Sequence, residues 1–139
     1  MLPSSYRPQT PADFIGPARA SAEGLAKLAA AASAEGDPVC VLFLGRPGVG
    51  KSSLANFFAR TLGATSQWNF VDCRPVNGKE VNLDFILRAS ASWRLSSLSS
   101  GYRIFQIEEV DRITADAQVV LLTMLDQMPR RSAVIASTN

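Results

Sequence analysis

The stretch that decides the fold reads V-C-V-L-F-L-G-R-P-G-V-G-K-S and runs from Val39 to Ser52. Its first part, Val39–Leu44, is a continuous apolar run bounded by Pro38 and Gly45, which predicts a strand covered on both faces of a parallel sheet. The residues after it fit the pattern G-x-x-x-x-G-K-[ST], and apolar side chains then recur at helical spacing. A strand, a glycine-rich turn and a helix in this order indicate a loop that binds phosphate groups.

Each residue type in this loop has a physical task. The glycines permit backbone angles and close approach that a Cβ would forbid, so that N–H groups can point at phosphates. Lys51 can reach the β- and γ-phosphate oxygens, and the Ser52 hydroxyl can hold Mg²⁺. The alternative is a glycine turn that only joins strand to helix, with Lys51 in solvent. The residues predicted to contact the nucleotide phosphates are Gly45, Pro47, Gly48, Val49, Gly50, Lys51, Ser52 and Ser53.

An acidic pair, Glu108-Glu109, directly follows the apolar run Arg103–Ile107. Residues at the carboxyl end of a parallel strand face the crevice where α/β sheets bind ligands. Because neighbouring side chains diverge there, one carboxylate can face Mg²⁺ and the other the γ-phosphate. Asn139 ends the next apolar run, where its amide could bond a phosphate oxygen and the attacking water. The alternatives are two surface acids in a turn and a Ser-Thr-Asn turn of ordinary composition.

Strands and helices are predicted to alternate along the whole chain. With 139 residues the chain has the length of a single domain, with an N-terminal segment 1–37 and a core 38–139. Short turns between alternating elements imply parallel strands with right-handed crossovers, and thus a three-layer α/β sandwich of the P-loop type. Strands are expected at Val39–Leu44, Trp68–Asp72, Arg103–Ile107 and Ala133–Ala136, and helices at Pro17–Glu35, Ser52–Leu62, from about Asn82 to Leu98, and from the cap Thr114 to Pro129.

Composition narrows the functional classes. Hydrophobic residues make up 47% of the chain and charged residues 19%, with a net charge of +2, which is typical of a folded protein and neither demands nor excludes nucleic acid. With two Cys and no His, a structural zinc site and a histidine base are excluded, and buried thiols are the expectation for Cys40 and Cys73. No stretch is long enough to cross a bilayer, so a soluble cytoplasmic protein is expected.

Four blocks of this sequence resemble the N-terminal part of the nucleotide-binding domain of AAA+ ATPases, most of all the clamp-loader and Holliday-junction branch-migration branch. Gly45–Ser52 resembles Walker A, Ile107–Asp111 resembles Walker B, and Ser137–Asn139 resembles the sensor 1 strand end. The opening block, Tyr6–Gly16, resembles the segment that lies against adenine in this family. The resemblance implies ATP and Mg²⁺ as cofactors. The side chains that it places at the adenine base are Tyr6, Arg7, Phe14 and Ile15.

The resemblance also assigns the polar site residues. It implies Glu108 on the Mg²⁺ side, Glu109 as the base, Asn139 as the water-positioning residue and Lys51 on the phosphates. Where the family usually has Asp, this chain has Glu108, whose extra methylene moves the carboxylate by about 1.5 Å. Mg²⁺ demands near-ideal octahedral geometry, so ATP binding is a safer expectation than rapid hydrolysis.

The family further implies parts that do not occur before the last residue, Asn139: a fifth strand, an arginine finger that serves a neighbouring subunit, and a helical lid. The chain is therefore expected to be a fragment that binds nucleotide weakly and turns it over slowly when isolated. The expected partners are ATP or ADP and the subunits of a ring, with DNA reached through the assembly. The leading hypothesis is an ATPase that drives a DNA-processing assembly; the alternatives are a nucleotide-binding scaffold subunit and a protein-remodelling AAA+ ATPase.

Overall fold

The protein is a three-layer α/β sandwich around a four-stranded sheet. The computed structural model describes residues 10–46, 50–64, 70–73, 83–94 and 101–138. Within them the elements follow in the order η2 (Pro11–Asp13), α1 (Pro17–Glu35), β1 (Val39–Leu44), α2 (Lys51–Thr61), β2 (Phe70–Cys73), α3 (Leu83–Arg94), β3 (Arg103–Ile107), η4 (Val110–Arg112), α4 (Ala115–Asp126) and β4 (Ser132–Thr138).

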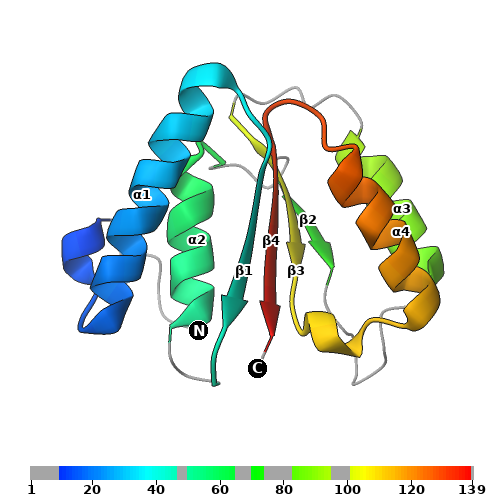
Figure 1. The fold of residues 1–139 in the computed structure, drawn as a ribbon, viewed down its shortest axis with the longest axis horizontal. Helices are drawn as coiled ribbons and strands as arrows, with labels where there is room; N and C mark the ends of the chain where they lie inside the picture. Colours follow the sequence, from blue (N-terminus) through cyan, green and yellow to red (C-terminus); the bar gives the residue numbers. More distant parts are fainter. Residues whose placement is uncertain (1–9, 47–49, 65–69, 74–82, 95–100, 139) are drawn as a thin grey trace.

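The sheet has the strand order β1-β4-β3-β2, and every neighbouring pair is parallel. Helices α1 and α2 cover one face, and α3 and α4 cover the other (Figure 1). Each face has its own apolar cluster: Phe58 and Ile104 are buried in the first, and Ile107 and Met124 in the second. The predicted α/β class with parallel strands is confirmed.

Helix α1 has the predicted bounds, but its packing stripe differs in one position. Ala22, Ala29 and Ala32 are buried, and Leu25 packs against the core beside them. Leu28 lies three residues after Leu25, so helical periodicity predicts that the two share a face, but Leu28 is 41% exposed. Small alanine side chains let α1 pack closely against α2. Because alanines also occur on the solvent side of α1, hydrophobic periodicity alone does not show which of them are buried.

Strand β1 forms as predicted but is covered on one face only. Val39 is buried, whereas Leu42 and Leu44 are 53% and 70% exposed and Cys40 is exposed. The reason is the strand order, which places β1 at the edge of the sheet. In the apolar cluster on the α3 and α4 face, the described strand residues belong to β3 and β4 and not to β1. The expectations of a strand covered on both faces and of a buried Cys40 thiol were therefore wrong.

The other elements match the sequence to within a few residues, and the two single-turn helices η2 and η4 were missed. Thr114 caps α4, because its hydroxyl accepts from the Ala117 N–H at 3.4 Å. Helix α2 begins at Lys51 and α3 at Leu83. The predicted element ends at Trp68, at Asn82 and at 95–98, and the side chain of Cys73, lie outside the described residues.

A backbone contact between two glycines joins the end of α2 to the start of β3. Gly63 and Gly101 both have left-handed φ angles, 83° and 91°, and the Tyr102 N–H donates to the Leu62 carbonyl at 3.1 Å. A Cβ added at Gly101 would lie 2.3 Å from the Gly63 oxygen. The two backbone segments can approach this closely only because both positions lack a side chain.

Replacing Gly101 with Ala is therefore expected to lower the free energy of unfolding by about 2–4 kcal/mol, through left-handed strain and the clash with Gly63. Urea denaturation measures the change. The matched control is Gly24→Ala in α1, where an added Cβ meets nothing within 4 Å and the helix should gain about 0.5–1 kcal/mol. Equal stability of the Gly101→Ala protein would show that this contact does not constrain the fold.

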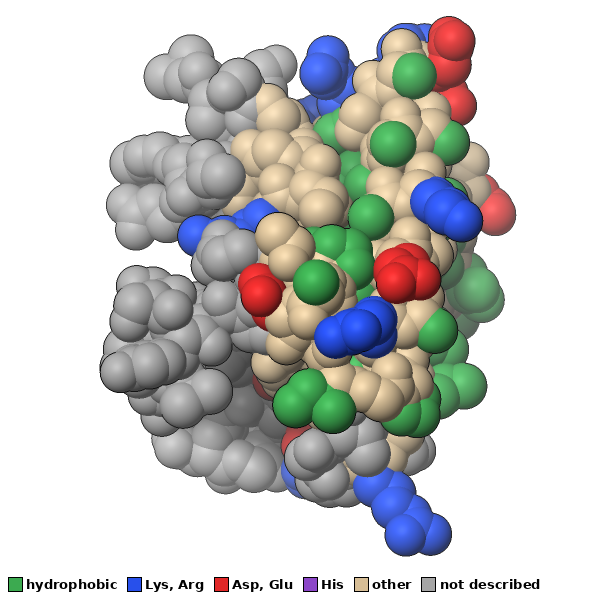
Figure 2. All heavy atoms as spheres, turned by 90° about the vertical axis from the view of Figure 1, so that its left-hand side faces the viewer, with side chains coloured by type: hydrophobic (Ala, Val, Ile, Leu, Met, Phe, Trp, Pro, Cys, Tyr) green, Lys and Arg blue, Asp and Glu red, His purple; other side chains and the backbone are tan. Residues whose placement is uncertain are grey.

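Positive charge is not concentrated on the described face that carries α1 (Figure 2). On the face that carries α1, Lys and Arg side chains lie among acidic and apolar ones and do not gather in one area of the described residues (Figure 2). Among the described helices, none combines the length and the apolar character needed to cross a bilayer. The described surface thus shows mixed charge and no dominant patch on this face.

Candidate functional site

The carboxyl ends of three strands meet at one edge of the sheet. Leu44 of β1 pairs with Thr138 of β4, and Ile107 of β3 pairs with Ala136, so the three strands end at nearly the same level. The glycine-rich loop, Gly45–Ser52, follows β1, and the turn that we call the acidic turn, Glu108–Arg112, follows β3. Since ligands of open α/β sheets bind outside this edge, the two segments singled out by sequence lie together where a ligand is expected.

The glycine-rich loop leads directly into the N-terminus of α2. Gly50, the N-cap residue, has φ 92°, a left-handed angle that favours glycine. A Cβ built on Gly50 meets no atom of the described residues within 4 Å. The first N–H groups of α2 and its positive dipole end lie at this turn, which suits an anion.

The Lys51 ammonium is held between two strands. Its Nζ donates to the Gly45 carbonyl at 2.5 Å and to the Thr138 carbonyl at 2.9 Å. These carbonyls lie at the ends of β1 and β4. Lys51 is therefore fixed over the carboxyl edge of the sheet, beside the end of β4.

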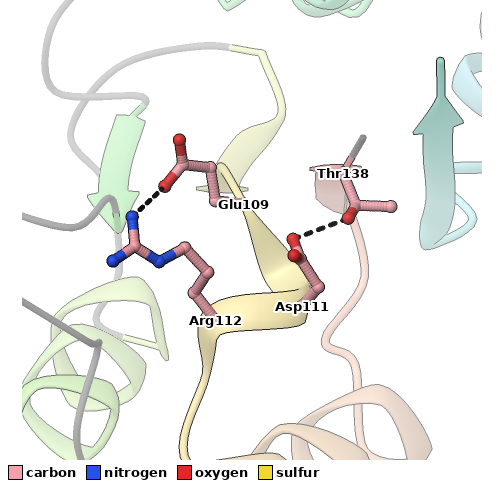
Figure 3. A network of polar contacts seen from close by, with 4 residues as sticks. All are labelled: Glu109, Asp111, Arg112 and Thr138. Atoms are coloured by element: carbon pink, nitrogen blue, oxygen red, sulfur yellow. Dashed lines mark hydrogen bonds and ion pairs between the residues drawn. The ribbon is translucent and has the colours of Figure 1, made fainter. Parts of the chain in front are cut away.

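The acidic turn bends sharply after β3. Glu109 has φ 53° and ψ 53°, a left-handed conformation that is uncommon for a residue with a Cβ. The Arg112 N–H donates to the Glu109 carbonyl at 2.8 Å, and the Arg112 guanidinium pairs with Glu109 Oε2 at 3.3 Å. The turn thus directs the Glu109 carboxylate toward Arg112 and away from β4 (Figure 3).

Asp111 is the acid of this turn that contacts β4. The Thr138 hydroxyl donates to Asp111 Oδ1 at 2.7 Å (Figure 3). This hydrogen bond is the main cause that lowers the pKa of the Asp111 carboxyl, and the charges of Arg112 and Lys51 act in the same direction. Sequence reasoning gave Asp111 no role, because nothing in the spacing indicates which strand end a residue in a turn will meet.

The remaining predicted residues differ in how the structure describes them. Ser52, on the first turn of α2, is exposed, while Ser53 and Glu108 are half-buried. A serine hydroxyl and a carboxylate are the oxygen donors that Mg²⁺ prefers, so the donor set fits this ion. The predicted residues that lie outside the described ones are Tyr6, Arg7, Pro47, Gly48, Val49 and Asn139.

The two described residues of the predicted adenine-binding set lie in different surroundings. Phe14 is 5% exposed, and its ring packs edge-on against Phe57 with centroids 5.4 Å apart. Ile15, the next residue, is 88% exposed. Phe14 thus ties the N-terminal segment to α2, and the side chain free to meet a ligand is that of Ile15.

A family model described as "ATPase family associated with various cellular activities (AAA)" matches residues 41–139. This match begins within β1 and contains the glycine-rich loop, the acidic turn and β4. The chain belongs to the AAA family of ATPases. AAA proteins generally hydrolyse ATP.

Individual AAA proteins show the same relationship. The chain is 29% identical over 136 residues to the replication factor C small subunit of Methanosphaera stadtmanae, with 96% of this chain covered. It is 32% identical over 123 residues to the Holliday junction branch migration complex subunit RuvB of Saccharopolyspora erythraea, with 88% covered. The chain spans 40% and 31% of the lengths of these two relatives.

Solved structures support the fold. The RuvB Holliday junction branch migration motor of Thermotoga maritima superposes with a TM-score of 0.69 at 23% identity, over 96% of this chain and 42% of that one. A DNA polymerase III gamma subunit-related protein of the same organism gives a TM-score of 0.66 at 13% identity, over 84% of this chain and 38% of that one. The AAA fold is thus present in part relative to these proteins.

Proposed function

We propose that this chain is the ATP-binding module of an AAA ATPase that hydrolyses ATP to drive a DNA-processing assembly of the clamp-loader kind. The observation that supports it most is the position of Lys51, whose ammonium bonds the ends of β1 and β4 beside the acidic turn. A triphosphate at the N-terminus of α2 would meet this cation and the first helix N–H groups together.

The side chains around this position divide the work of phosphoryl transfer. Lys51 would bind the β- and γ-phosphate oxygens. Glu109 would accept the proton of the attacking water, and Asn139 would hold that water. Ser52 and Glu108 would hold Mg²⁺, which when bound neutralises charge on the phosphate oxygens. Gly45, Pro47, Gly48, Val49, Gly50 and Ser53 would complete the phosphate loop.

The adenine would lie against the N-terminal segment. The exposed Ile15 side chain offers an apolar surface for the base, and the neighbouring Phe14 anchors this segment to α2 through its contact with Phe57. Tyr6 and Arg7 are proposed to lie close to the base. Apolar contact with a few polar groups is the usual composition of such a site.

The DNA-processing role is supported by the names of two relatives, a replication factor subunit and a branch migration subunit. A scaffold subunit that binds ATP with little hydrolysis is the second candidate, favoured by Glu108 where the family usually carries Asp. The third is an AAA ATPase that remodels proteins. The three differ in what accelerates hydrolysis: DNA, nothing or a protein substrate.

The test is ATP hydrolysis by the intact protein with its partner subunits, with and without primed single-stranded DNA. DNA is expected to raise the turnover rate, while the isolated chain binds ATP weakly and turns it over slowly because a neighbouring subunit completes the site. A fluorescent ATP analogue, competed with ATP, ADP and GTP, measures binding separately. Binding without DNA-stimulated turnover would support the scaffold instead, and absence of ATP binding would refute the proposal.

A further inference from the structure

We infer that Asp111 and Thr138 are positioning residues that hold the acidic turn against the end of β4, and so set where Glu109 lies relative to Lys51. The inference rests on the proposed ATPase function, since the relative position of a base and a phosphate-binding lysine matters only if hydrolysis occurs. Asp111 lies in the segment that resembles Walker B and Thr138 in the one that resembles sensor 1, and neither was assigned an individual role there.

Thr138 bonds to both sides of the site through different atoms. Its backbone carbonyl accepts from Lys51 Nζ at 2.9 Å, and its hydroxyl donates to Asp111 Oδ1 at 2.7 Å. Lys51 belongs to α2 and Asp111 to η4, so this one residue connects the phosphate-loop helix with the acidic turn. The contacts form a continuous path from Lys51 to Asp111.

The acidic turn is held by local bonds, by apolar packing and by the Asp111 bond. The Arg112 bonds to the Glu109 carbonyl and carboxylate close the turn on itself, across three residues. Val110 and the buried Ile113 also pack in the apolar cluster that contains Val134 and Ala136 of β4. The Asp111 bond spans 27 residues and reaches the neighbouring strand, with Asp111 directed toward Thr138 and Glu109 directed the other way (Figure 3).

The left-handed backbone conformation of Glu109 makes the position of its side chain depend on the contacts that hold the turn. A left-handed residue with a Cβ is strained and persists when its surroundings hold it there. Asp111 is two residues further along and is held by Thr138. Releasing that contact would let the turn relax and carry the Glu109 side chain with it. A displacement of about 1 Å at a reacting group can lower a rate by about 100-fold.

The contact is better suited to positioning than to stabilising the fold. Asp111 is exposed and the hydrogen bond lies at the surface, where solvent competes for both groups. The lowered pKa of Asp111 agrees with an ionised carboxylate that accepts this bond. Removing either partner should therefore affect catalysis far more than unfolding.

The test compares variants of the intact protein in its assembly by kcat, KM and ATP affinity. Thr138→Val and Asp111→Ala are each expected to lower kcat about 10- to 100-fold, with KM and the Kd for ATP changed less than about threefold. Thr138→Ser, which keeps the hydroxyl, and Asp111→Asn, which keeps an acceptor oxygen, should restore most of kcat. The double variant Asp111→Ala/Thr138→Val should be no slower than either single variant, because both remove one interaction.

The control is Asp126→Asn, an exposed acid at the far end of α4, which should leave kcat unchanged. Thermal denaturation checks folding, and Asp111→Ala carries the test if Thr138→Val does not fold. Unchanged kcat in Asp111→Ala, or losses that multiply in the double variant, would overturn the inference while leaving the ATPase proposal intact. Absence of ATP binding by the unchanged protein would overturn both.

Discussion

Replacing Lys51 with Met is expected to weaken ATP binding about 10- to 100-fold, since a hydrogen bond to a charged group contributes about 1.5–3 kcal/mol. Hydrolysis should fall further, by about 100- to 1,000-fold in kcat, because the ammonium also stabilises charge that develops on the transferring phosphate. Met keeps the apolar stem and removes only the cation. Titration with a fluorescent ATP analogue gives the affinity, and single-turnover hydrolysis gives the rate.

The matched control is Lys27→Met, which removes an exposed lysine from α1 and should change neither quantity. Thermal denaturation without nucleotide separates binding from folding, because Lys51 also bonds the carbonyls of Gly45 and Thr138. If the Lys51→Met protein binds ATP as tightly as the unchanged protein, the glycine-rich turn is only a connection between strand and helix.

Glu109→Gln is expected to leave ATP bound but not hydrolysed. Gln is nearly isosteric and cannot accept a proton, so kcat should fall by about 100-fold or more while the Kd for ATP changes less than about threefold. The variant should therefore trap ATP on the intact protein. A scaffold subunit would show the same nucleotide occupancy before and after the substitution, which is the result that would contradict a motor.

The Glu109 variant also loses its ion pair with Arg112, in which both side chains are nearly half exposed, 44% and 46%. Such surface pairs contribute about 0–1 kcal/mol, so the melting temperature should barely move. Glu23→Gln in α1, an exposed acid, controls for the change in net charge. Retention of full turnover by Glu109→Gln would assign the base to another residue.

The features that sequence predicted well are those that depend on neighbouring residues. Val39–Leu44 is apolar throughout and became a strand, and Thr114 became a helix cap because its hydroxyl reaches an N–H only three residues away. Strand and helix types follow from such local patterns. The same local logic placed the glycine-rich loop after β1 and the acidic turn after β3.

What sequence could not provide depends on which elements become neighbours. The exposure of Leu42 and Leu44 follows from the place of β1 at the sheet edge, which no residue within the strand encodes. The contact of Asp111 with Thr138 crosses 27 residues and required the parallel pairing of β3 with β4. The left-handed angle at Glu109 was equally unexpected, since non-glycine residues rarely adopt it.

The two carbonyl bonds of Lys51 have a thermodynamic consequence for nucleotide capture. A lysine side chain that is ordered loses about 1.5–2 kcal/mol of rotational freedom. Because the carbonyls of Gly45 and Thr138 already restrict Lys51 in the folded chain, much of this entropy loss accompanies folding rather than association. In the proposed function, a phosphate bound by Lys51 would replace these neutral carbonyl acceptors with charged oxygens around an ammonium whose rotamer is already selected.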